Sequence, residues 1–103
     1  MKIFVTTDFV AFHNWPGAPQ EVEFLRSLHR HIFRVKVVWK VEHDNRDLEF
    51  FIQKEKLNKF LQENFSNKNL IGVSCEMMAN KIKTEFNAES VEVSEDGENG
   101  AIV

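Results

Sequence analysis

Residues 29–42 read His-Arg-His-Ile-Phe-Arg-Val-Lys-Val-Val-Trp-Lys-Val-Glu, and this stretch gives the clearest indication of the fold. Its odd-numbered positions run His, His, Phe, Val, Val, Trp, Val, whereas the even-numbered positions carry the charges. Successive side chains of a strand point to opposite faces, so this alternation predicts a long strand with one dry and one wet face. Such strands are typical of antiparallel sheets that are covered on one side.

The flanking segments predict an α+β domain. A Pro-Gly-Ala-Pro loop follows the first strand, and turn residues at 43–47 follow the second. Strands are expected over residues 2–13, 29–42, 90–95 and 101–103. Helices are expected from Phe50 to Phe65 and, after an N-cap at Ser74, from Cys75 to Phe86. The order β-β-α-α-β-β predicts an antiparallel four-stranded sheet with two helices on one face, as a single domain over 1–103.

Composition excludes several classes of protein. The 103 residues carry a net charge of -3, with basic and acidic residues interspersed, which argues against nucleic-acid binding and against a membrane surface. No apolar run approaches the ~18 residues of a membrane span. One cysteine allows no intrachain disulfide, and the first residues do not resemble a signal peptide. We therefore expect a cytoplasmic protein.

Three histidines form the main candidate site. His29 and His31 are two apart and project to one face of their strand, and His13 has the parity of the apolar residues in the first strand. If the two strands are antiparallel neighbours, the three imidazoles can converge. Three histidines with a fourth position open are typical of catalytic zinc. The alternative is that two of these histidines are surface or capping residues.

Cys75 and His43 have simpler interpretations. Cys75 falls on the apolar stripe of the second helix, which favours a small buried residue over a nucleophile. His43 keeps the strand parity but lies at the far end of its strand, which favours a turn residue.

Glu95 places a carboxylate at the end of the inward face formed by Val91 and Val93. A buried carboxylate needs a partner, and a ligand with paired N–H donors, such as the edge of a pterin or guanine, would supply one. The alternative is that the strand ends here and Glu95 faces water.

Four motifs resemble those of the 6-pyruvoyl-tetrahydropterin synthase family. Residues 9–13, Phe-Val-Ala-Phe-His, are similar to its Phe-x-Ala-x-His, and residues 28–31, Leu-His-Arg-His, to its Leu-His-Gly-His. Residues 74–79 resemble the start of its second helix, and residues 91–95 its Val-x-Val-x-Glu. The order and spacing of these motifs hold across nearly the whole chain.

The resemblance implies a tunnelling fold and a zinc enzyme acting on 7,8-dihydroneopterin triphosphate or a related pterin. Members form 6-pyruvoyl-tetrahydropterin or, in queuosine biosynthesis, 6-carboxy-tetrahydropterin. It further implies zinc on His13, His29 and His31, a pterin anchored by Glu95, and a homo-oligomer, trimer or hexamer, with sites at the subunit interfaces.

The chain departs from the family at the groups that transfer protons. The cysteine expected before the His-x-His is absent; Leu25 and Glu23 stand four and six residues before His29. Because some branches use a glutamate, the resemblance favours Glu23 as the base, with Glu21 behind it. The alternative is that both glutamates are charged loop residues without a role in the site. The Asp-His pair expected after the first helix is also absent, Arg30 replaces the central glycine, and the chain is short for the family.

These observations predict a zinc-dependent lyase of the 6-pyruvoyl or 6-carboxy tetrahydropterin synthase type. Two alternatives keep the fold: a pterin- or purine-binding module without turnover, and an enzyme with altered chemistry such as dihydroneopterin side-chain cleavage. A third is a structural or interaction protein whose histidines are coincidental. Imidazole also suits Fe²⁺ and Ni²⁺, so the pattern alone leaves the identity of the metal open.

Overall fold

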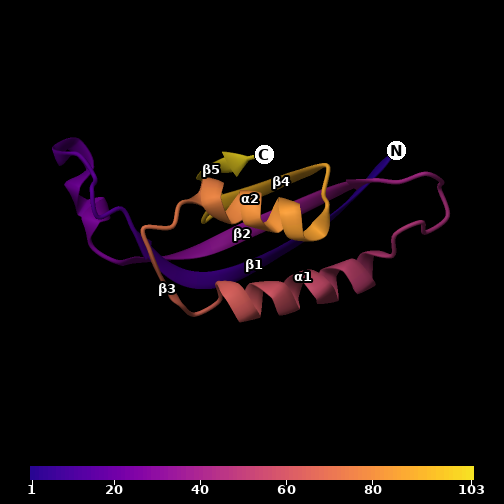
Figure 1. Cartoon of the computed structure of the whole chain (residues 1–103), viewed down its shortest axis with the longest axis horizontal. Helices are drawn as coiled ribbons and strands as arrows, with labels where there is room; N and C mark the ends of the chain where they lie inside the picture. The colour runs from indigo at the N-terminus through magenta and orange to yellow at the C-terminus, as the bar shows by residue number, and fades with distance from the viewer.

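Two long antiparallel strands run along the length of the molecule (Figure 1). They are β1 (Lys2–Asn14) and β2 (His29–Lys40), and they pair from Lys2 opposite Lys40 to His13 opposite His29. The computed structural model describes residues 1–103, with principal extents of 51 × 23 × 20 Å. In Figure 1 the loop between β1 and β2 lies at one end of the long axis, and the loop that leads into α1 lies at the other.

Three shorter strands complete a mixed five-stranded sheet in the order β3-β1-β2-β4-β5. Strand β4 (Ser90–Glu95) pairs antiparallel with β2, and β5 (Asn99–Ile102) pairs antiparallel with β4. Strand β3 (Asn69–Ile71) runs parallel to the end of β1. The outer strands are β3 and β5, and because β3 pairs only with Phe12–Asn14, most of β1 has β2 as its only strand neighbour.

Three helical segments connect the strands. α1 (Phe50–Asn64) begins at an N-cap glutamate, Glu49, whose carboxylate accepts hydrogen bonds from two backbone N–H groups. α2 (Cys75–Phe86) begins at Ser74, whose hydroxyl accepts a hydrogen bond from the backbone N–H of Met77. A 3-10 segment, η1 (Gln20–Arg26), lies in the loop between β1 and β2 and buries no residue. None of these helices has both the length and the apolar character that crossing a membrane requires.

One hydrophobic core lies between the helices and the odd-numbered face of the sheet. Phe33, Val35 and Val37 of β2 are buried together with Leu57 of α1 and Met78 of α2. The odd-numbered residues of β2 from Phe33 to Trp39 face this core, so the alternation in residues 29–42 agrees with the observed burial. The histidines at the start of β2 extend the same face beyond the core, and this places them at one end of the sheet.

The α+β class is confirmed, and the strand at 90–95 and the N-cap at Ser74 agree with the expectation. The expected purely antiparallel four-stranded sheet is wrong, because β3 adds a fifth, parallel strand. A three-residue strand shows no recognisable alternation, and its pairing depends on the free edge of β1. The last strand begins at Asn99 rather than Ala101, since Asp96 and Gly97 both adopt positive φ and close a tight turn.

Candidate metal centre

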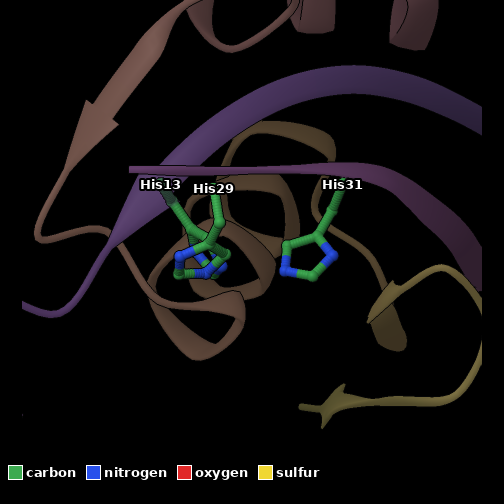
Figure 2. Close-up of side chains that lie close together, drawn as sticks. All are labelled: His13, His29 and His31. Atoms are coloured by element: carbon green, nitrogen blue, oxygen red, sulfur yellow. The ribbon is translucent and has the colours of Figure 1, made fainter. Parts of the chain in front are cut away.

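The register of β1 and β2 brings the three histidines together. His13 is directly opposite His29, and His31 lies two residues further along β2, opposite Ala11. Directly opposed residues of an antiparallel pair have neighbouring side chains, and residues two apart share a face. Figure 2 shows the three side chains extending from the two strands toward the same side.

The three imidazoles form a close cluster. One ring nitrogen from each histidine lies within 4.8 Å of those from the other two. The ring centroids are separated by 4.5 Å for His13 and His29, 5.2 Å for His13 and His31, and 5.0 Å for His29 and His31. This spacing allows one metal ion to bind all three rings.

The Nδ1 atom of every histidine in the cluster already has a hydrogen-bond partner. His13 Nδ1 lies 2.9 Å from the carbonyl oxygen of Val73, and His29 Nδ1 lies 2.9 Å from that of Ser27. His31 Nδ1 lies 2.7 Å from Oδ2 of Asp96. Carbonyl and carboxylate oxygens only accept, so each Nδ1 donates its proton and leaves Nε2 with a free lone pair.

The remaining ring nitrogens fit a metal ion. The Nε2 atoms of His29 and His31 are buried and make no hydrogen bond. A buried polar atom without a partner is rare and costly, and a bound cation would satisfy it. Histidines that ligate a metal typically donate the other ring N–H to a carbonyl or carboxylate, which is the arrangement found here for all three.

Burial keeps His13 in the form that a metal needs. Desolvation lowers the pKa of His13 below its ordinary value, and this outweighs the opposing effects of the Val73 carbonyl and the Glu95 carboxylate. The imidazole is therefore neutral at pH 7, and a neutral ring nitrogen is the one that coordinates a metal.

Glu95 lies against the open side of this cluster. Its Oε2 is 2.9 Å from His31 Nε2, and its Oε1 is 3.6 Å from His13 Nε2. Despite the short distance, His31 Nε2 makes no hydrogen bond, so the carboxylate lies off the direction in which that nitrogen would donate. Glu95 is therefore close enough to interact with a ligand at the metal position.

A cavity of about 470 Å³ opens beside the cluster. His13, His29 and Glu95 line it, together with exposed parts of Trp15 and Met77. The Asn14 side chain holds one rim of this cavity: it accepts a hydrogen bond from the Gly72 N–H and donates one to the Arg26 carbonyl. The site thus combines three histidines that could hold a metal ion, a carboxylate and a cavity with apolar side chains in its wall.

Glu23 and Glu21 lie elsewhere. Both are exposed on η1, and neither lines the cavity. Cys75 is buried at the start of α2, as expected for a core residue, although its side of the helix also faces the cavity. His43 is exposed beside Asp47 in the loop before α1, beyond the end of β2 opposite to the cluster, as expected for a turn residue.

Asp96 contacts the histidine cluster and is not predicted from the sequence. Asp96 and Gly97 form a pair that is typical of hairpin turns. A role in the turn is therefore enough to explain an aspartate at this position, without any contact to the histidines. The contact with His31 depends on how the β4–β5 turn folds back over β2, and no local pattern encodes it. The hydrogen bond from His31 lowers the pKa of the Asp96 carboxyl, so it is ionised at neutral pH.

Comparisons with known proteins do not assign the chain to a family. No protein-family model matches it, and no curated protein matches it significantly in sequence.

Proposed function

We propose that this chain is a cytoplasmic, zinc-dependent, pterin-forming lyase of the 6-pyruvoyl or 6-carboxy tetrahydropterin synthase type. The observation that carries the proposal is the cluster of three imidazoles whose Nδ1 atoms all donate hydrogen bonds, which leaves the Nε2 lone pairs available to a cation. The sheet order and the packing of helices on one face support a tunnelling fold. The four motifs that resemble the family lie on the elements that form the site.

His13, His29 and His31 would hold the zinc ion through their Nε2 atoms. Three imidazoles with an open position favour zinc in a catalytic rather than a structural role. When bound, zinc supplies Lewis-acid polarisation of hydroxyl and carbonyl oxygens on the substrate. The cluster lies at the wall of the cavity, so a small molecule in the cavity would reach the open position.

Glu95 would anchor the pterin. Its carboxylate is partly exposed and lies in the same cavity as the cluster, so it can accept N–H groups from the guanidine-like edge of the ligand. Trp15 and Met77 offer apolar surface to a flat ring, with 51% and 58% of their surface exposed. A cavity of this size suits a small organic ligand.

Metal content is the first test. We expect about one zinc per chain in the purified protein after reconstitution, because three preorganised imidazoles bind zinc tightly. His29→Ala removes a ligand and is expected to abolish stoichiometric binding. His43→Ala is the matched control, since this exposed histidine lies outside the cluster. Elemental analysis that finds full zinc in His29→Ala would exclude the assigned site.

Product analysis is the second test. The zinc-loaded protein is incubated with 7,8-dihydroneopterin triphosphate, and we expect release of triphosphate and a tetrahydropterin product. Glu95→Gln keeps the size of the side chain but replaces one acceptor oxygen by a donor, so it is expected to weaken substrate binding at least tenfold, or about 1.4 kcal/mol. Unchanged substrate affinity in Glu95→Gln would rule out the anchoring role.

A second candidate function is a pterin-binding module without turnover. The exposure of Glu23 on η1, outside the cavity, favours it, because a base must reach the proton that it removes. Glu23→Gln tests whether the chain is a lyase with Glu23 as its base or a binding module without turnover. If Glu23 is the base, this variant loses turnover and retains pterin binding. Pterin binding with no product in the unaltered protein would favour the module instead.

A further inference from the structure

We propose that Asp96 is a positioning residue for His31, because its carboxylate sets the tautomer that leaves His31 Nε2 free to bind a cation. The proposal extends the metal-binding part of the proposed function. It stands on two contacts of one carboxylate. Oδ2 accepts a hydrogen bond from His31 Nδ1 at 2.7 Å, and Oδ1 accepts one from the backbone N–H of Ile32 at 2.9 Å.

The Asp96 carboxylate is itself held in place. The backbone N–H of Asp96 donates to the carbonyl of Ile32 at 2.8 Å, so Asp96 bonds to both the N–H and the carbonyl of one residue on β2. Asp96 and Gly97 have φ values of 56° and 77°, and Glu98 N–H donates to the Glu95 carbonyl at 3.0 Å. This tight turn prevents the carboxylate from rotating away without loss of a hydrogen bond.

His31 differs from the other two ligands in its partner. His13 and His29 donate to backbone carbonyls, which remain in place whatever the side chains are. His31 alone donates to a side chain. Substitution of the hydrogen-bond partner can therefore change the tautomer of His31, but not that of His13 or His29.

A second carboxylate acts on the opposite nitrogen of the same ring. Glu95 Oε2 lies 2.9 Å from His31 Nε2, so a proton on Nε2 would be attracted to Glu95 and would block the metal position. Asp96 makes a well-aligned hydrogen bond, whereas the Glu95 contact is not aligned as one. Asp96 therefore keeps the proton on Nδ1 against the competing attraction of Glu95.

The alternative role of Asp96 is that of a turn residue alone, since Asp-Gly is a common pair in two-residue hairpin turns. Asp96→Asn separates the two roles. Asparagine tolerates positive φ as well as aspartate does, so the turn is kept. If the amide oxygen accepts from Ile32 N–H, the NH₂ group faces His31 Nδ1 and donates to it, and this moves the ring proton to Nε2.

The test combines a spectroscopic and an affinity measurement. In the metal-free protein, imidazole ¹⁵N shifts are expected to show His31 protonated at Nδ1, and Asp96→Asn is expected to shift the proton to Nε2. Zinc affinity, measured by competition with a chelator, is expected to fall about 10- to 100-fold in Asp96→Asn, the usual effect of losing such an outer partner. The Co²⁺ absorption spectrum should change with it.

The matched control is Asp47→Asn. Asp47 also accepts a backbone N–H, from Glu42 at 2.7 Å, and also lies beside an imidazole, with 3.5 Å between its Oδ1 and His43 Nε2. It lies in the loop before α1, so this variant is expected to leave zinc affinity and the His31 shifts unchanged. If Asp96→Asn fails to fold, Asp96→Gly keeps the turn and removes both side-chain hydrogen bonds.

A folded Asp96→Asn variant with an unchanged His31 tautomer and unchanged zinc affinity would overturn the proposal. If the unaltered protein binds no zinc, the proposed function fails separately. The tautomer measurement on the metal-free protein then still decides whether Asp96 sets the state of the His31 ring.

Discussion

Burial makes the Cys75 thiol unreactive although it lies next to the candidate metal site. It lines the same cavity as His13 and Glu95, yet desolvation raises the pKa of its thiol to about 12, with the carboxylates of Glu95 and Glu76 adding to the effect. The thiolate is the form that attacks electrophiles and binds metals. Cys75 therefore stays protonated at neutral pH in the metal-free protein.

We therefore predict that Cys75 is unreactive in the native protein. With a pKa of about 12, on the order of one thiol in ten thousand is ionised at pH 8. Modification by a disulfide reagent should be slow in the folded, metal-free protein and fast in denaturant, which is the control for total thiol. Rapid stoichiometric modification of the folded protein would contradict the burial of this thiol.

The same raised pKa makes stability depend on pH. The ordinary thiol pKa is 9.0, so as the pH rises above about 9 the unfolded chain loses this proton before the folded one does. The free energy of unfolding should therefore fall as the pH rises from about 9 toward 12. Denaturant titrations of the protein and of Cys75→Ala measure this, and the variant should lose that part of the alkaline slope.

The β4–β5 hairpin carries both Glu95 and Asp96, the two carboxylates that contact the histidine cluster. The hairpin depends on a close approach at Gly100, which pairs with Ser94. A Cβ atom at Gly100 would overlap the carbonyl oxygen of Val93 and lie 2.6 Å from Ser94 Cα. Backbone atoms cannot move aside as a flexible side chain can, so only glycine fits here without displacing β5.

Gly100→Ala is accordingly predicted to loosen the hairpin. We expect a loss of about 1–3 kcal/mol of stability, the usual cost of overpacking, together with weaker zinc binding because Asp96 moves with the turn. Gly17→Ala is the matched control, since its nearest neighbour would be Trp15 Nε1 at 3.9 Å. Thermal unfolding and zinc titration measure both effects, and equal melting temperatures for the two variants would contradict the prediction.

The molecule as a whole leaves much of one sheet face and two sheet edges uncovered. Phe4, Phe12 and Ile32 lie on the face opposite the helices and have 57%, 37% and 36% of their surface exposed. Strands β3 and β5 have a neighbour on one side only. Natural proteins usually cover or pair such edges, which agrees with the homo-oligomer that the family resemblance implies.

We predict a trimer or hexamer of the 12.1 kDa chain in solution, measured by sedimentation or light scattering. Ile102→Lys places a charge on the open β5 edge, where the residue is 71% exposed, and should shift the equilibrium toward monomer. Phe51→Lys is the control, because this residue is 77% exposed on α1 and does not belong to a strand. A monomer at all concentrations would refute the assembly.

Local patterns in the chain suffice to predict the long strands, the two helices and the shared face of the three histidines. Alternation and helical spacing act over a few residues, and parity places His29 and His31 together whatever else the chain does. The strands, the helices and the shared face of His29 and His31 are therefore determined by the sequence without a structure. The convergence of His13 also depends on the register of β1 and β2, which sets His13 opposite His29.

The folded chain alone determines the remaining parts of the site. β3 exists because an edge of β1 is free, and Asp96 meets His31 because the β4–β5 turn closes over β2. The exposed position of Glu23, outside the cavity, depends on how η1 packs. Such contacts join residues far apart in the chain, and their geometry is set by packing and by turns, so no local periodicity encodes them.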